Sequence, residues 1–446
     1  MCEPSPSIHP LYIYICLVGS NNINLLLIFL CCAQFSLTQT PYAFQTSNYG
    51  GIFSSQLQPA HLSGSRISTE FMLGAGSVEL WNNYIKIATP LLKKRAIRDS
   101  LATMPEYIPK LFPTALNGDD KDLYTNISLW GPGFMQTSAE GYGYAFTSRF
   151  RNLGSINNLS EVFLKQSFDT NDYQLLLKQP NDISDASISA ASFLELGVGF
   201  GITLCDKSDK AIKIGLNLKY LTGFAGGSLH SKGASFGIHD TSSISLYDVN
   251  MRYAYSNSLE NLDYISPLNH FFKGNDGWAW DFGLIYDFRS KKNQPNPPKF
   301  RPDLNNYKLR ISLSLLDIGK ITFRQSPFIR DYRGSIDSLN PSKIRLNTLQ
   351  DINTFFAQNF TNQPGGNSFH VLLPARLNGY VDYRFHNNCS VLLMLNFNLA
   401  APGFGQIRAQ NSLALIPRFE SKWLGYEMPI SFQGYQNVAI GSSFRL

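Results

Sequence analysis

Residues 193–204 read FLELGVGFGITL, and their pattern indicates most clearly how the chain folds. Every second residue from Leu194 to Leu204 is apolar, whereas the positions between them hold Phe193, Glu195, three glycines and a threonine. Such alternation is typical of a β-strand, whose successive side chains point to opposite faces of a sheet. A polar turn at 205–210 and a second alternating stretch at 211–220 follow directly. Together they predict a hairpin of two long antiparallel strands.

Similar alternation covers most of the remaining chain. In 247–255 and 278–288 an uncharged apolar row faces a row that carries charge. The same pattern marks 141–152, 307–316, 375–386, 390–400, 411–420, 424–433 and 437–446, with less regular versions at 66–79 and 124–137. We expect an all-β fold of about 14 strands, because period two is the signature of strands. Two long insertions, 153–187 and 325–374, have room for short helices such as 160–168 and 349–360.

Apolar rows of this kind suit either a secreted β-sandwich or a barrel that spans a membrane, so alternation alone leaves both open. The strand lengths, nine to twelve residues, match a tilted crossing of a bilayer. Trp278 and Phe288 end one row, roughly 25 Å apart on a tilted strand, which is the height of a lipid-facing band between aromatic girdles. Charged residues make up only 16% of the chain, against about 25% in soluble domains. We therefore expect a transmembrane antiparallel β-barrel in a bacterial outer membrane.

The first 43 residues are expected to be a signal peptide, and 44–446 the barrel domain. Residues 23–33 form an apolar run of secretory length, too short for a membrane-spanning helix. No Lys or Arg precedes Arg66, so the usual basic start is missing and a transmembrane anchor is the alternative. Four cysteines lie in this leader, and only Cys205 and Cys389 remain beyond it. Two cysteines predict no disulfide framework and no zinc site.

The charged residues opposite the apolar rows are expected to line the lumen. They are Glu195, Lys213, Asp248, Arg252, Asp281, Asp287, Lys308, Arg310, Arg376, Asp382 and Arg384. A structural network of paired charges is the simpler interpretation, and a polar path is the functional one. The seven histidines show no metal-ligand spacing, and no phosphate-binding or dinucleotide motif occurs, so no metal or cofactor is expected. The net charge of +6 forms no basic stripe, which argues against a nucleic-acid partner.

One short motif suggests chemistry. Residues 233–237 match G-x-S-x-G, with Ser235 in the place of a nucleophile. That motif needs a buried strand before it and a helix after it, whereas here it follows a Gly/Ser-rich stretch. A flexible loop is the better interpretation, and we expect no enzyme. A barrel hydrolase is the least favoured alternative.

The order of seven short stretches along the chain is informative: 48–51, 58–60, 277–286, 307–310, 314–319, 373–374 and 417–420. In this order they resemble a family of uncharacterised outer-membrane β-barrels from Bacteroidota, grouped with fatty-acid-transporter-like and PorV-like barrels. The family has no established activity, but the uncharged apolar face beside a charged, glycine-bearing one leads us to expect transport of small or hydrophobic solutes, or a role in envelope assembly or secretion. The expected partners of such a barrel are outer-membrane lipid, the barrel-assembly machinery during insertion and an unidentified envelope protein. The resemblance assigns no catalytic residue.

This chain departs from the family in two places. Gln58 stands where the family usually has Asn before Pro-Ala, and the family pattern continues past Leu446. Single-chain bacterial barrels have even strand numbers, whereas the segments above number 13. Either one strand is overlooked, or the chain is truncated at its C-terminus before the barrel closes. A truncated barrel would expose an unpaired strand edge.

Overall fold

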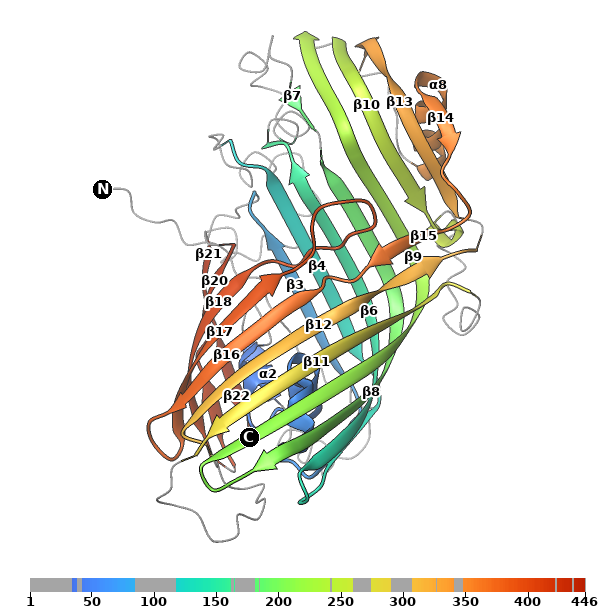
Figure 1. Ribbon diagram of the computed structural model, residues 1–446. Coiled ribbons are helices and arrows are strands. Elements are labelled where there is room, and N and C mark those ends of the chain that lie inside the picture. The colour runs from blue at the N-terminus through green and yellow to red at the C-terminus, as the bar shows by residue number, and fades with distance from the viewer. Residues whose placement is uncertain are drawn as a thin grey trace, which may run out of the picture.

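The computed structural model describes residues 34–37, 42–84, 118–161, 164, 181–183, 185–240, 243–259, 274–289, 307–325, 327–340, 348–421, 423–434 and 437–445. Within these ranges the chain is mostly antiparallel β-structure with a few short helices, as the alternation predicts (Figure 1). None of the helices in the described part of the chain is long and apolar enough to cross a membrane.

The strands form one sheet of 22 segments. The main wall consists of β2 (Thr69–Met72), β3 (Ala75–Asn82), β4 (Lys121–Trp130), β5 (Gly133–Thr137), β6 (Tyr142–Leu159), β8 (Ser187–Asp206), β9 (Lys210–Asp240), β11 (Asp276–Phe288), β12 (Leu309–Phe323), β15 (Phe369–Leu372), β16 (Arg376–Arg384), β17 (Cys389–Asn398), β18 (Ser412–Glu420), β19 (Gly425–Glu427), β20 (Ile430–Gln433), β21 (Asn437–Ile440) and β22 (Ser442–Arg445). The remaining strands are β1 (Gln34–Leu37), β7 (Asn181–Asp182), β10 (Ser243–Tyr255), β13 (Phe328–Leu339) and β14 (Thr361–Pro364).

The number of segments exceeds the expected 14 because several long strands are interrupted and because β1, β7, β13 and β14 were not among the predicted strands. β2 and β3, for example, pair side by side with β5 and β4, which both pair with β6. The ladder then runs through β8, β9, β11, β12, β16, β17 and β18 to β20, and β1 adds to β22. The sheet curls until its first and last strands approach, where the ring of Trp81 on β3 lies against Gly434. Within the described residues, this seam is packed by side chains and carries no β-ladder.

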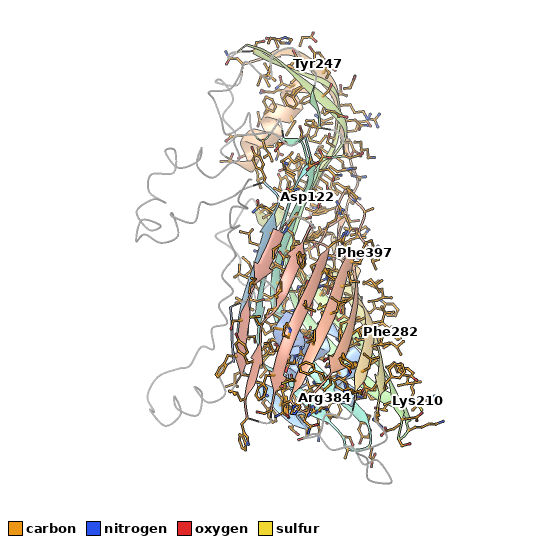
Figure 2. All side chains as sticks on the ribbon, turned by 90° about the vertical axis from the view of Figure 1, so that its left-hand side faces the viewer. Asp122, Lys210, Tyr247, Phe282, Arg384 and Phe397 are labelled. Atoms are coloured by element: carbon orange, nitrogen blue, oxygen red, sulfur yellow. The ribbon has the colours of Figure 1, made fainter. Side chains whose placement is uncertain are left out.

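The faces of the sheet are inverted relative to a soluble protein. Phe282 is 46% exposed and Phe397 is 52% exposed, and both lie on the outer surface (Figure 2). On the opposite face Asp281 and Glu195 are almost completely buried. The expected outward apolar rows are thereby confirmed. The β-sandwich alternative is wrong, because a sandwich would bury these rows against each other.

The interior is occupied by an N-terminal segment, residues 42–65, which we call the plug. It consists of α2 (Tyr42–Thr46), α3 (Gly51–Leu57) and the 3₁₀ helix η1 (Pro59–Ser63) (Figure 1). Glycines on the inner face of the sheet make room for η1. A Cβ atom on Gly215 would lie 2.3 Å from the carbonyl carbon of Pro59, and one on Gly283 would overlap Gln58. The glycines of the polar rows are therefore explained by close approach of the plug.

The prediction that the apolar row of 247–255 faces lipid is wrong. It belongs to β10, which pairs with the upper part of β9 and with β13, while β14 pairs with β13. These strands project beyond the main wall (Figure 1). We call this part the extension. The row expected to face lipid, including Tyr253 and Tyr255, is buried, and it belongs to an apolar cluster that also takes in α8 (Leu349–Asn359).

The helix α8 confirms the expected helix at 349–360, and a capping box of Thr348 and Asp351 begins it. β13 and β14 were not expected within the insertion 325–374. A short 3₁₀ turn, η4 (Asn257–Leu259), follows β10. The expected helix at 160–168 lies mostly outside the described residues. So does the predicted signal peptide, whose described parts are β1 and the buried pair Tyr42 and Ala43; it stays a prediction.

Candidate functional site: the closed interior

The plug is held to the wall by hydrogen bonds at its lower part, the end nearest the turns 207–209 and 385–388. Asn48 is the hub of these contacts. Its Nδ2 donates to Glu420 Oε2 at 2.8 Å and lies 2.9 Å from Tyr307 Oη, while its Oδ1 accepts from Arg310 at 2.9 Å. The hydroxyl of Ser47 donates to Glu420 Oε1 at 2.6 Å. Side chains from β12 and β18 therefore share one anchor on the plug.

A second anchor lies on η1. The Nε2 atom of Gln58 donates to Ser312 Oγ at 2.5 Å and to the backbone carbonyl of Leu313 at 3.0 Å. His61 Nε2 lies 2.6 Å from Tyr380 Oη. Burial, together with the nearby cations Arg310 and Lys213, holds the pKa of His61 well below its usual value. The imidazole is therefore neutral at pH 7.

Two groups of paired charges flank these anchors. Asp287 binds Arg310 at 2.6 Å and Lys213 at 2.9 Å. Arg418 reaches Glu427 at 2.8 Å and Asp382 at 3.3 Å. All six side chains are buried, so each charge is stable there only because a partner of opposite sign is in contact.

A larger group, which we call the central ion cluster, lies above the plug. It contains Arg149, Arg151, Lys219, Arg376, Glu195, Asp281 and Asp317. Arg149 and Arg151 both contact Glu195, at 2.7 and 3.2 Å. Asp317 receives Arg151 at 3.0 Å and Lys219 at 2.8 Å, whereas Arg376 lies 3.4 Å away.

The backbone at Asp317 is unusual. Its φ is +55°, in the left-handed region, and the register between β11 and β12 shifts at this point. Its amide donates to Asp281 Oδ1 at 2.8 Å. A bulge of this kind re-aims a side chain at a local cost of about 1–3 kcal/mol. Here it turns the carboxylate of Asp317 toward three cations.

An apolar layer closes the interior above the central ion cluster. The loop 399–411 between β17 and β18 brings Ile407 and Ala409 against inward side chains such as Phe193 and Leu221. Backbone amides of this loop donate to Ser228 on β9 and Ser155 on β6, at 2.7 and 3.2 Å. The loop therefore bridges strands on different parts of the wall. The interior is closed by the plug below and by this loop above.

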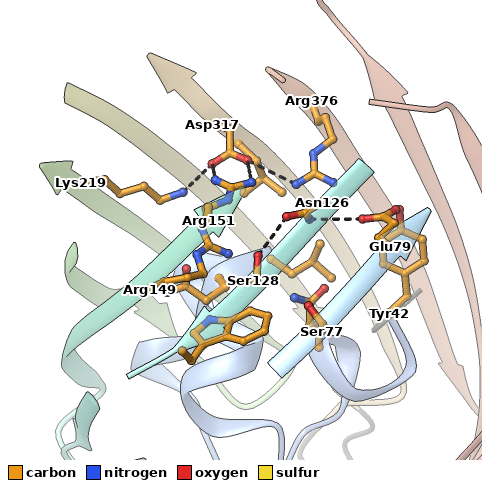
Figure 3. A pocket seen from close by; sticks show the side chains of 15 residues that line it. Tyr42, Ser77, Glu79, Asn126, Ser128, Arg149, Arg151, Lys219, Asp317 and Arg376 are labelled. Atoms are coloured by element: carbon orange, nitrogen blue, oxygen red, sulfur yellow. Dashed lines mark hydrogen bonds and ion pairs between the residues drawn. The ribbon is translucent and has the colours of Figure 1, made fainter. Parts of the chain in front are cut away.

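Between the plug and the central ion cluster lies a polar cavity (Figure 3). The cavity volume is about 40 Å³, and the empty space around it, counted with the part that opens to solvent, is about 560 Å³. Its lining comprises Tyr42, Gln45, Gln56, Leu57, Ser77, Glu79, Asn126, Ser128, Trp130, Arg149, Arg151, Lys219, Leu316, Asp317 and Arg376. The plug, β3, β4, β6, β9, β12 and β16 all contribute to it, so the cavity exists only when the sheet has curled around the plug.

The structure brings most of the predicted lumen residues into this interior. Glu195, Asp281 and Arg376 belong to the central ion cluster, and Lys213, Asp287, Arg310 and Asp382 to the lower charge groups. The other four predicted residues lie away from these groups. Asp248 and Arg252 lie on the extension, Lys308 is exposed with its Nζ 5.0 Å from the centre of the Tyr383 ring, and Arg384 binds the turn at Asn387.

Several interior charges were not among the predicted residues. Lys219 lies on the polar row of 211–220, so the alternation of that stretch was enough to predict that it faces the interior. Arg149 and Arg151 share the inner face of 141–152 by the same rule. Asp317 could not have been found in this way, because the bulge changes its parity.

The chemistry suggested by Ser235 is not supported by its surroundings. Ser235 lies within β9, opposite Tyr247 and Asp182, and no helix follows. The motif is therefore neither a flexible loop nor a nucleophile elbow. Cys205 and Cys389 are free. The described residues contain no group of His, Cys, Asp or Glu that could hold a metal ion.

Comparison with solved structures finds weak likenesses to membrane barrels. The translocator domain of the autotransporter NalP from Neisseria meningitidis is 8% identical, with a TM-score of 0.29, covering 79% of this chain and 96% of that one. A TodX mutant, a monoaromatic hydrocarbon channel, is 9% identical, with a TM-score of 0.31, covering 89% and 93%. A Pseudomonas aeruginosa FadL homologue is 8% identical, with a TM-score of 0.21, covering 88% and 92%. Similarity this low supports no functional assignment.

Sequence comparison gives a firmer result. No curated protein matches the chain. A family model does match, and it covers residues 59–446, which include the whole sheet from β2 to β22. The chain therefore belongs to the family of unknown function DUF5723.

Proposed function

We propose that this protein is an integral outer-membrane barrel whose plugged interior gates the passage of small polar solutes. The observation that carries the membrane placement is the inversion of the two faces: the apolar rows point outward and the paired charges inward. In water such a surface would expose many large apolar side chains without cover, whereas hydrocarbon chains would solvate them. The proposed partners are outer-membrane lipid and, during insertion, the barrel-assembly machinery.

The ends of the apolar band support the same placement. Trp278 packs against Tyr220 at one end of the band, and Tyr286 packs against Phe288 at the other. Lys308 lies over the ring of Tyr383 near the lower end. Aromatic rings and snorkelling lysines are typical of the interface between lipid and water. The extension would then stand outside the bilayer.

A polar cargo fits the interior better than an apolar one. The cavity is lined mainly by charged and amide side chains, and the walls beside it are held by buried ion pairs. An apolar solute would leave those groups desolvated and gain little contact in return. Passage requires movement of the plug and of the loop 399–411, because together they close both ends.

Location is tested by fractionation of cells that express the full chain. We expect the protein in the outer-membrane fraction, extractable only with detergent, and with faster gel migration when unheated. Recovery in the soluble periplasmic fraction without detergent would contradict the placement.

Gating is tested by conductance in planar bilayers. The wild-type protein should be nearly silent, and Asn48→Ala should show frequent openings, because it removes the contacts of the plug with Glu420, Tyr307 and Arg310. Asn157→Ala is the matched control, since Asn157 is equally buried but hydrogen-bonds only wall residues. Equal silence of both variants would reject a plug that gates.

A further inference from the structure

The cavity above the plug contains buried donors without an acceptor. Four side chains that line it each have a buried N–H group with no hydrogen-bond partner: the Nε1 of Trp130 and the Nε atoms of Arg149, Arg151 and Arg376. Trp130, Arg149 and Arg151 are more than nine-tenths buried. Unpaired buried donors are rare and costly, so their concentration at one cavity needs an explanation.

The charges around the cavity also indicate that an acceptor is missing. Within the central ion cluster, four cations share the three carboxylates of Glu195, Asp281 and Asp317. Arg376 is the least well paired of the four, because its contact with Asp317 is 3.4 Å long and that carboxylate already binds Arg151 and Lys219. The ion-paired cluster therefore carries one positive charge in excess.

One acidic side chain opposes this excess. Glu79 on β3 also lines the cavity, where the Nδ2 of Asn126 donates to it at 3.4 Å. Figure 3 shows Glu79 beside Tyr42, on the side away from Arg149. The carboxylate is not within ion-pair distance of the cluster's cations in the described contacts. Its charge lowers the affinity of the cavity for an anion without filling the unpaired donors.

We propose that this cavity is a binding site for a small oxyanion, a carboxylate or a phosphate group, held by Arg376, Arg149, Arg151 and the indole N–H of Trp130. An oxyanion supplies several acceptor oxygens for the unpaired donors and a negative charge beside Arg376, the least well paired cation of the cluster. Hydrogen bonds between such donors and an anion are about twice as strong as neutral ones. A bound cation would face the excess positive charge, and an apolar ligand would leave the donors unpaired.

The site does not depend on whether the plug opens or where the protein resides. It is formed by the folded sheet and the plug together, so it is testable on the full chain in a non-ionic detergent. The proposed ligand is a free solute, because the plug and the inner face of the wall line the cavity and its empty space extends to solvent. A micelle of a phosphate-headed lipid, titrated in parallel, distinguishes a lipid source from a free one.

The test is calorimetric titration with inorganic phosphate at constant ionic strength, repeated with acetate. Arg376→Gln should weaken binding about tenfold or more, because it removes a charged donor. Trp130→Phe should weaken it by about fivefold, because it removes the indole N–H group and keeps an aromatic ring. Glu79→Gln should strengthen binding severalfold, because it removes the opposing charge. Arg384→Gln is the matched control, since Arg384 binds the lower turn. The affinity of this variant for phosphate should stay within about twofold of the wild-type value.

Glu79→Gln should raise the affinity for phosphate, whereas Arg376→Gln and Trp130→Phe should lower it, so a general loss of folding cannot produce the expected pattern. Arg376→Gln should fold, because Asp317 keeps Arg151 and Lys219; if it does not fold, Trp130→Phe and Glu79→Gln still decide. Absence of phosphate and acetate binding would overturn the proposal. Binding that all four variants leave unchanged would identify an adventitious ion only, and binding of the lipid alone would replace the free solute by a headgroup.

Discussion

Phe282 offers a direct test of what surrounds the sheet. It lies on the outer row of β11 between Trp278 and Phe288, and it is 46% exposed. With a rise of about 3.3 Å per residue and a tilt of about 40°, it lies about 10 Å from the level of Trp278 and about 15 Å from that of Phe288. This places Phe282 near the middle of a band roughly 25 Å high.

The perturbation is Phe282→Lys. If hydrocarbon surrounds this row, the free energy of unfolding should fall by about 2–4 kcal/mol, a change of roughly 30- to 700-fold in the unfolding equilibrium. If water surrounds it, the cost of a surface substitution should be within about 0.5 kcal/mol, apart from lost packing. Phe282→Leu measures that packing loss, because it keeps the side chain apolar.

The assay is equilibrium unfolding by urea of protein inserted into lipid vesicles, followed by tryptophan fluorescence. Leu204→Lys is the control at the edge of the band. Leu204 is 61% exposed and lies two residues before the end of β8, so its replacement should cost only about 0–1 kcal/mol. Equal small losses for Phe282→Lys and Leu204→Lys would refute the membrane placement of the outer row.

Three further changes test the interior and the extension. Glu195→Gln should destabilise the protein by about 3–5 kcal/mol in the same unfolding assay, because Arg149 and Arg151 lose a buried partner; a loss below about 1 kcal/mol would show that the pair is solvated. His61 is neutral when folded but takes up a proton below pH 6.5 when unfolded, so stability should fall by about 1.4 kcal/mol per pH unit below that value, and His61→Gln should remove this part of the dependence. An unchanged pH profile in His61→Gln would contradict the neutral imidazole. Phe356→Ala should loosen the extension, because its ring packs 5.2 Å from that of Tyr332, and limited proteolysis should then cut α8 first while the main wall stays intact; equal resistance of wild type and variant would contradict this.

The interior residues show where the alternation of a strand predicts the correct face of the sheet and where it does not. Glu195 and Phe193 were assigned to one face by alternation, and both are buried inside, with Phe193 in the apolar layer. Asp317 escapes the same rule because the bulge with φ of +55° changes which way its side chain points. Bulges depend on how neighbouring strands pair, so a single strand's sequence does not reveal them.

The extension is the clearest limit of sequence reasoning. The row with Tyr253 and Tyr255 alternates as cleanly as the outer row of β11, yet it is buried in a cluster with α8. Alternation says that a row is apolar, but it does not say whether lipid or another part of the chain covers it. That choice depends on β10 pairing with the upper half of β9, far above the apolar band.

The amino-acid sequence alone predicts the strands and, apart from 247–255, which faces of the sheet carry charged and apolar side chains. It could do so because these properties are local: the period of two is written in neighbouring residues. The positions of the plug and of the loop 399–411 in the interior become visible in three dimensions alone, and so does the meeting of seven elements around one polar cavity. The cavity's donors come from residues as far apart as Trp130 and Arg376, and no short stretch of sequence records which distant side chains will share a space.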